Sequence, residues 1–251
     1  MSETTTTLEK TGLGATVRRD AWWVEPLLTG LGFGAFIVYS TWAAFQGKYY
    51  EYGPYLSPFY SPNLSSLFPW WKLSPAFLIL WAPGGFRATC YYYRKAYYRA
   101  YFLDPPACAV GEPSKRAYRG ETAFPFILQN IHRYFFYLAF IFIFILSYDA
   151  VRSFIFDGKF GIGVGSLVLT GNVILLSCYT FGCHSLRHLI GGKLDCFTCP
   201  GASINHKLWC GVSALNERHM LWAWCSLFSV GFADLYVRLC SMGIWTDYRF
   251  F

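Results

Sequence analysis

Residues 137–146 read YLAFIFIFIL, an apolar run without a charged side chain near the end of a longer apolar segment, Phe124–Tyr148. An α-helix rises 1.5 Å per residue. About 20 apolar residues therefore cross the roughly 30 Å hydrocarbon core of a bilayer. The segment predicts a membrane-spanning helix.

The composition of the whole chain agrees with this prediction. Of 251 residues, 55% are hydrophobic and 14% are charged, against about 25% charged in typical globular proteins. This is too little polar surface for a soluble domain. The net charge of +7 does not indicate nucleic-acid binding, because the basic residues are spread over the loops. The nine cysteines do not indicate a secreted disulfide scaffold, because the chain is long and apolar, and we expect no cleavable signal peptide.

Five apolar segments predict an all-α integral membrane protein that forms a five-helix bundle. They are Pro26–Phe45, Pro75–Phe102, Phe124–Tyr148, Ile162–Leu189 and Asn216–Cys240. In the second segment, Pro83-Gly84-Gly85 predicts a kink, and the Tyr- and Arg-rich end is expected to leave the bilayer. Residues 1–25 are predicted to be a polar cytoplasmic segment, and residues 26–251 a single transmembrane domain.

The loop charges predict the orientation. With the N-terminus in the cytoplasm and the C-terminus outside, thirteen Lys and Arg residues lie on the cytoplasmic side and six on the other. Positively charged loops prefer the cytoplasmic side. We therefore expect a multi-pass protein of the bacterial plasma membrane in this orientation.

This orientation gathers metal-binding residue types at the cytoplasmic end. They are Cys90, Cys108, His132, His184, His188 and His219. A single histidine near a helix end is more often a hydrogen-bonded interfacial residue than a ligand. Four histidines at similar depth beside cysteines favour a metal or haem site, since ionisable groups at membrane depth are costly.

Three cofactors suit such a set of residues. Haem b would take two facing histidines, with His132 opposite His184 or His219. Zinc would take tetrahedral Cys and His ligands but carry no electrons. A Rieske-type 2Fe–2S cluster would take two thiolates on one iron and two imidazoles on the other. A structural anchor without a cofactor is a further alternative, and the composition does not choose among the four.

A family resemblance favours the cluster. The run from Gly85 to Arg99, GFRATCYYYRKAYYR, and the following Pro105–Val110, PPACAV, resemble the membrane anchor of actinobacterial type F succinate dehydrogenase, the mycobacterial Sdh-one class. The similarity extends over Gln129–Phe135, over the Cys183-His184 and Arg187-His188-Leu189 motifs, and over Glu217–Met220. It reaches nearly the whole chain.

The resemblance implies a membrane subunit that binds the flavoprotein and iron–sulfur subunits of succinate dehydrogenase and reduces quinone through an embedded Rieske-type cluster. Cys90 and Cys108 would supply the thiolates. Two of His132, His184, His188 and His219 would supply the imidazoles, with the choice left open. Arg87 and Arg133, charged at membrane depth, are candidates for quinone binding, with a snorkelling or ion-paired arginine as the alternative. The basic, aromatic region Tyr91–Tyr101 is expected to contact the iron–sulfur subunit.

Four residues of the fourth loop resemble a zinc knuckle with irregular spacing: Cys196, Cys199, His206 and Cys210. Reduced thiols in a cytoplasmic loop are the favoured interpretation there. Cys178, Cys225 and Cys240 are expected to be packing residues. Asp149, and Asp234 with Arg238, are expected to form pairs or caps on the outer side, without a chemical role.

Overall fold

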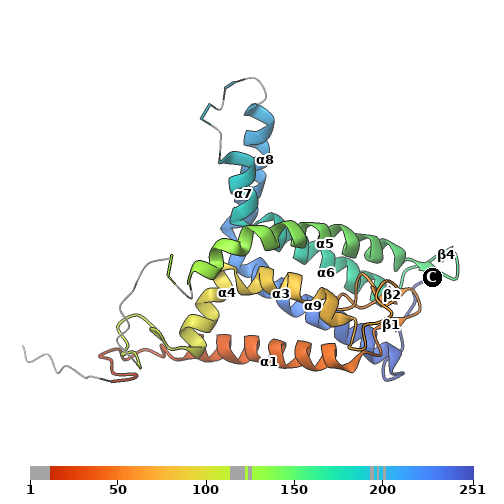
Figure 1. The fold of residues 1–251 in the computed structure, drawn as a ribbon, viewed down its shortest axis with the longest axis horizontal. Coiled ribbons are helices and arrows are strands. Elements are labelled where there is room, and N and C mark those ends of the chain that lie inside the picture. Colours follow the sequence, from red (N-terminus) through yellow and green to blue (C-terminus); the bar gives the residue numbers. More distant parts are fainter. Residues whose placement is uncertain (1–11, 114–121, 124–125, 193–194, 197, 200–201) are drawn as a thin grey trace, which may run out of the picture.

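Four long helices lie side by side in the computed structural model, which describes residues 12–113, 122–123, 126–192, 195–196, 198–199 and 202–251 (Figure 1). They are α1 (Val24–Gln46), α5 (His132–Arg152), α6 (Val164–Phe181) and α9 (His219–Ser241). A 3₁₀ turn, Phe126–Ile131, precedes α5. Within the described residues, these four helices are long and apolar enough to cross a membrane. The helical membrane character predicted from the sequence is therefore confirmed.

The second predicted span is not one helix. It consists of α2 (Ala76–Ile79), α3 (Trp81–Ala88), α4 (Tyr91–Ala96) and a π-helical turn, Tyr97–Tyr101. Pro83 has no N–H to donate to the carbonyl of Ile79, so the α-helical pattern is interrupted between α2 and α3. A second break falls at Cys90, whose backbone is extended (φ −71°, ψ 134°), and α4 turns from α3 towards α1 (Figure 1).

The fourth and fifth predicted spans also have different ends. α6 ends at Phe181, and the extended backbone of Cys183 (φ −67°, ψ 139°) begins a separate helix, α7 (His184–Gly191). α7 packs against α8 (Ala202–Glu217). This helical pair projects from the bundle at a steep angle (Figure 1). His184 and His188 therefore belong to the projecting pair rather than to the end of a spanning helix.

Two β-hairpins and the C-terminus lie at the other end of the bundle (Figure 1). Strand β1 (Glu51–Tyr52) pairs with β2 (Tyr55–Leu56), and β3 (Ile155–Phe156) pairs with β4 (Lys159–Phe160), both antiparallel. α1 begins at the opposite end (Figure 1). The arrangement as a bundle of five spanning helices remains a prediction. Which end faces the cytoplasm remains a prediction.

A buried ion pair holds this hairpin end together. Arg238 Nε lies 3.2 Å from Asp234 Oδ2, and both side chains are at most 1% exposed. Asp234 also accepts hydrogen bonds from the hydroxyls of Tyr39 and Ser57, and Arg238 Nη1 donates to the Lys48 carbonyl at 3.0 Å. The predicted pairing of Asp234 with Arg238 is confirmed, and it links α9 to α1 and to the loop that follows. Asp149 likewise accepts a hydrogen bond, from the Ser61 hydroxyl.

Two adjacent glycines of α3 permit a matched test of this packing. A Cβ on Gly85 would lie 2.2 Å from a ring carbon of Phe135 on α5, whereas a Cβ on Gly84 would have no neighbour within 4 Å. We expect Gly85→Ala to destabilise the detergent-solubilised protein by about 1–3 kcal/mol, because the contact must open. Gly84→Ala should be neutral or slightly stabilising, since alanine is the better helix former. Thermal melting would measure both, and equal melting temperatures would contradict the close α3–α5 packing.

Candidate metal centre

Two buried cysteines lie at the two helix breaks. Cys90 precedes α4 and Cys183 precedes α7, each with extended backbone, and their exposed fractions are 3% and 2%. Both belong to one core cluster that also contains Phe86, Tyr93 and Tyr179. The two thiols are close enough to interact electrostatically. The breaks therefore bring together cysteines that are 93 positions apart in the chain.

His132, the first residue of α5, faces one of these thiols. Its Nε2 lies 3.2 Å from Cys183 Sγ, and its Nδ1 lies 2.9 Å from Thr89 Oγ1. The Thr89 hydroxyl has one proton, which it donates to the Gly85 carbonyl at 2.7 Å. It must therefore accept from Nδ1–H, so that Nε2 carries the free lone pair of a neutral imidazole. Metal-bound histidines are commonly held in this way by a hydrogen bond to the other ring nitrogen.

His219, the first residue of α9, completes the group. It is 3% exposed, and the Tyr179 ring stacks on it at 5.0 Å between centroids. Its Nδ1 is buried and has no hydrogen-bond partner among the described residues. A Cβ on Gly182 would lie 3.2 Å from this nitrogen, so the glycine keeps space beside it open. His219 also interacts electrostatically with His132.

We call Cys90, Cys183, His132 and His219 the thiol–imidazole cluster. Within the described part of the chain, no three or more His, Cys, Asp or Glu side chains converge so as to hold one metal ion. A mononuclear site needs at least such a triad. A Rieske-type cluster divides its protein ligands, two thiolates on one iron and two imidazoles on the other. The residues present therefore fit a 2Fe–2S group of this type in number and kind, and three of the four are buried.

Cys108 lies at the surface. Its carbonyl accepts a hydrogen bond from Arg18 Nη1 at 2.9 Å, and its side chain is exposed. It borders a cavity of about 360 Å³ that Trp22 and Lys95 also line. The hydrogen bond from Arg18 to Asp20 in the same region lowers the pKa of the Asp20 carboxyl below its usual value. No contact described for Cys108 involves a histidine or another cysteine.

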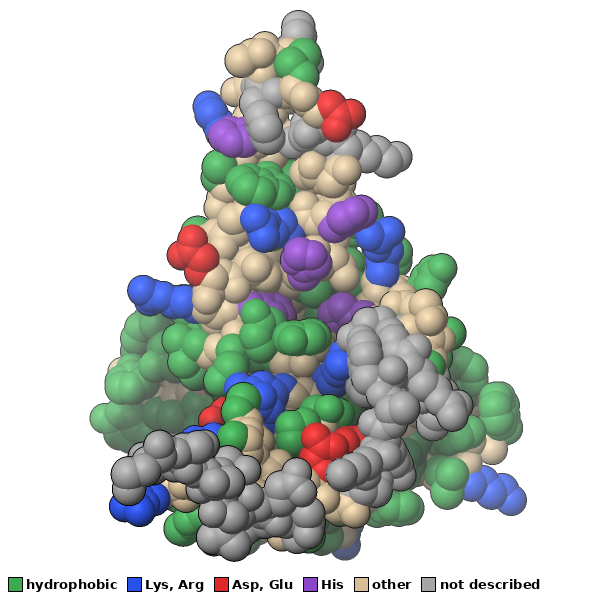
Figure 2. All heavy atoms as spheres, turned by 90° about the vertical axis from the view of Figure 1, so that its left-hand side faces the viewer, with side chains coloured by type: hydrophobic (Ala, Val, Ile, Leu, Met, Phe, Trp, Pro, Cys, Tyr) green, Lys and Arg blue, Asp and Glu red, His purple; other side chains and the backbone are tan. Residues whose placement is uncertain are grey.

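The other two candidate histidines are exposed on α7. His188 Nδ1 lies 2.8 Å from Arg133 Nη2, and Arg133 is itself exposed. His184 and His188, like His132 and His219, lie at the bundle end where α1, α5 and α9 begin. Figure 2 shows histidines in a column along the middle of this face, with Lys and Arg side chains beside them.

Cys183 is the residue that the sequence argument did not assign as a ligand. It occurred only as the neighbour of His184 in a motif, inside a segment read as a continuous spanning helix. The available signal was Gly182, because glycine often marks the end of a helix. A helix that ends there leaves the following cysteine free to turn into the core.

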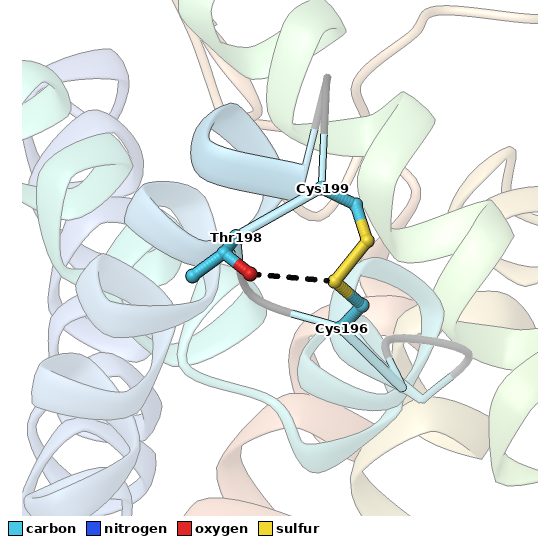
Figure 3. The surroundings of a disulfide bond; sticks show 3 residues. All are labelled: Cys196, Thr198 and Cys199. Atoms are coloured by element: carbon cyan, nitrogen blue, oxygen red, sulfur yellow. Dashed lines mark hydrogen bonds between the residues drawn. A yellow bond between two sulfur atoms is a disulfide. The ribbon is translucent and has the colours of Figure 1, made fainter.

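Two cysteines in the segment between α7 and α8 are bonded to each other. Cys196 and Cys199 form a disulfide, with 5.7 Å between their Cα atoms (Figure 3). The expectation of reduced thiols is thus corrected: the two-residue spacing brings the Cα atoms within disulfide range. Cys210 Sγ lies 3.7 Å from His206 Nε2, one helical turn away on α8, and both are exposed.

Two comparisons with known proteins show what this chain is similar to. Residues 24–243 match the family model described as actinobacterial succinate dehydrogenase subunit SdhC. The chain is also similar to a chain in the structure titled "Mycobacterium smegmatis Sdh1 complex in the apo form", with 46% sequence identity and a TM-score of 0.85. The match covers 94% of each chain. No curated protein matches the chain.

Proposed function

The chain belongs to the actinobacterial succinate dehydrogenase subunit SdhC family, and from that premise we propose that this membrane anchor passes electrons from the soluble subunits to quinone through a Rieske-type 2Fe–2S cluster. The observation that carries the proposal is the thiol–imidazole cluster, which brings together donors from four separate segments, with Cys90, Cys183 and His219 buried and His132 half-buried. The sequence has no G-x-G-x-x-G dinucleotide fingerprint. Succinate is therefore oxidised at a flavin on a partner subunit.

The four donors would divide between the two irons of the cluster according to their chemistry. Cys90 and Cys183, as thiolates, would bind one iron, and His132 and His219, as neutral imidazoles, would bind the other. The bound group would supply a one-electron carrier whose potential the imidazoles raise. Phe86 stacks on the His132 ring at 4.6 Å between centroids and 10° between planes, as Tyr179 does on His219. These stacked rings hold both imidazole planes and exclude water from the centre.

The basic end of the bundle is the proposed contact for the iron–sulfur subunit. Arg94, Lys95 and Arg99 are on α4 and the π-helical turn, among the tyrosines of Tyr91–Tyr101. Tyr92 joins this surface to the centre: it lines the 360 Å³ cavity and lies 5.3 Å from the His219 ring. An electron arriving there would have a short path to the thiol–imidazole cluster.

Quinone would approach from within the bundle. An apolar cavity of about 160 Å³ is lined by Phe59, Ile143 and Leu176, and at one end by Phe86 and Arg87. Because Phe86 stacks on His132, this end borders the proposed centre. Quinone reduction consumes two protons, and the exposed His184 and His188 carry imidazoles, a side chain commonly used for proton transfer. Arg133, which is hydrogen-bonded to His188, would then hold this histidine in position as a proton carrier rather than contact quinone.

Purified succinate dehydrogenase complex containing this chain tests the proposal directly. We expect the reduced complex to show an EPR signal of mixed-ligand 2Fe–2S type. We also expect iron and acid-labile sulfide in excess of the content of the soluble subunits, since the anchor would add one cluster of its own.

Two results would overturn the proposal. A sharp haem α band in the reduced-minus-oxidised visible spectrum, without the mixed-ligand signal, would make the subunit a haem b anchor. Iron and sulfide equal to those of the soluble subunits alone would make it a structural tether.

A further inference from the structure

Arg87 on α3 is a buried cation whose described partners are all neutral. Its guanidinium donates from Nη1 to the Tyr93 hydroxyl and to the Ala223 carbonyl at 3.2 Å, and from Nη2 to Ser226 Oγ at 3.1 Å. The side chain is 9% exposed. Within the described residues, no carboxylate forms a salt bridge with it.

Such an arrangement is unusual at membrane depth. A buried charge is retained only when hydrogen bonds and an opposite charge offset the loss of hydration. Arg238, the other buried arginine at a bundle end, has Asp234 as its partner. Three hydrogen bonds engage the guanidinium of Arg87, but its positive charge is not balanced by any described acidic group.

The thiols of the thiol–imidazole cluster are nearby groups that would be negative as iron ligands. Arg87 interacts electrostatically with Cys90, three residues along the chain, and with His219. Its guanidinium lies 4.9 Å from the centroid of the Tyr179 ring, which also stacks on His219. The cation therefore lies beside the proposed centre, separated from it by buried aromatic side chains that screen charge poorly.

We propose that Arg87 raises the reduction potential of the centre by serving as its counter-charge. This inference rests on the proposed function. Two thiolates and two neutral imidazoles leave the oxidised 2Fe–2S group neutral overall, and one added electron makes it an anion. The positive charge of Arg87 favours the reduced form alone. Electrons thus pass more readily from the partner's iron–sulfur groups to the centre.

EPR-monitored redox titration of the intact complex tests this role. In Arg87→Gln, we expect the ratio of reduced to oxidised centre at a fixed ambient potential to fall at least tenfold, which is about 59 mV for a one-electron couple. Arg87→Lys, which keeps the charge, should restore most of the wild-type ratio. Arg133→Gln, which removes an exposed arginine of the same face, should leave the potential unchanged.

A second pair of variants leaves Arg87 in place. Ser226→Asp puts a carboxylate at the position that accepts a hydrogen bond from Arg87 Nη2. The carboxylate should offset the positive charge of Arg87 and lower the reduction potential, as Arg87→Gln should. Ser226→Asn, its uncharged counterpart, should not. This pair of variants tests the role of Arg87 even if the Arg87→Gln complex does not assemble.

These experiments distinguish a failure of the role of Arg87 from a failure of the proposed function. Wild-type potential in both Arg87→Gln and Ser226→Asp would overturn the role of Arg87 and leave the cluster assignment intact. A wild-type complex without a mixed-ligand signal would overturn the proposed function itself. An unchanged potential with a raised KM for quinone in Arg87→Gln would assign Arg87 to quinone binding instead.

Discussion

In the Cys183→Ser complex, we expect the mixed-ligand 2Fe–2S signal to be absent from the EPR spectrum while the signals of the soluble subunits remain. A serine hydroxyl replaces a thiolate that we propose binds iron, so the centre should not assemble. Succinate:quinone turnover should fall more than about tenfold, since even the loss of a residue that only supports a metal ligand costs 10–100-fold. Succinate oxidation with a soluble artificial acceptor should persist, because our proposal places the flavin on another subunit.

Two control variants make this result specific. Cys108→Ser should retain the signal, because Cys108 is exposed and its described contacts are with Arg18. Cys178→Ser, one turn before the end of α6, should retain it as well, since Cys178 is only a packing residue. The opposite pattern, a signal that survives in Cys183→Ser and disappears in Cys108→Ser, would return the second thiolate to Cys108 and refute the thiol–imidazole cluster.

The largest expected change in stability comes from the hairpin end. Asp234→Ala should destabilise the detergent-solubilised anchor by about 3–5 kcal/mol, because it leaves the buried Arg238 guanidinium without an opposite charge. The hydroxyls of Tyr39 and Ser57 would lose their acceptor at the same time. Thermal unfolding followed by circular dichroism or by aggregation would measure the loss.

Removing both charges provides the matched comparison. The double variant Asp234→Leu/Arg238→Met should be considerably more stable than Asp234→Ala, because no unpaired charge remains in the core. Asp20→Asn, which breaks the exposed pair with Arg18, should change the melting temperature little. A stability of Asp234→Ala close to wild type would show that Arg238 finds another environment, contrary to its 1% exposure.

The sequence predicted the membrane character and most of the spans. The apolar run Tyr137–Leu146 lies in α5, and the segment Pro26–Phe45 lies in α1. Hydrophobic length is a local property, so it can be read from consecutive residues without knowing their neighbours. The pairing of Asp234 with Arg238 could also be predicted from the local sequence, because residues four apart lie on one helix face.

Helix ends were less well predicted. Residues Pro75–Phe102 and Ile162–Leu189 are each predominantly apolar, and hydropathy does not show where the backbone changes direction. The breaks at Cys90 and Cys183 depend on how α4 packs against α1 and how α7 packs against α8. These are tertiary contacts, which override the local helical preference.

The sequence by itself determined that thiols and imidazoles would lie towards one end of an apolar bundle, because depth in a membrane follows from position along each span. Only the tertiary structure decided which of them meet. It buries Cys183 beside His132 and leaves Cys108, His184 and His188 at the surface. The physical reason is that a contact between side chains depends on the direction of each backbone segment, which long-range packing sets.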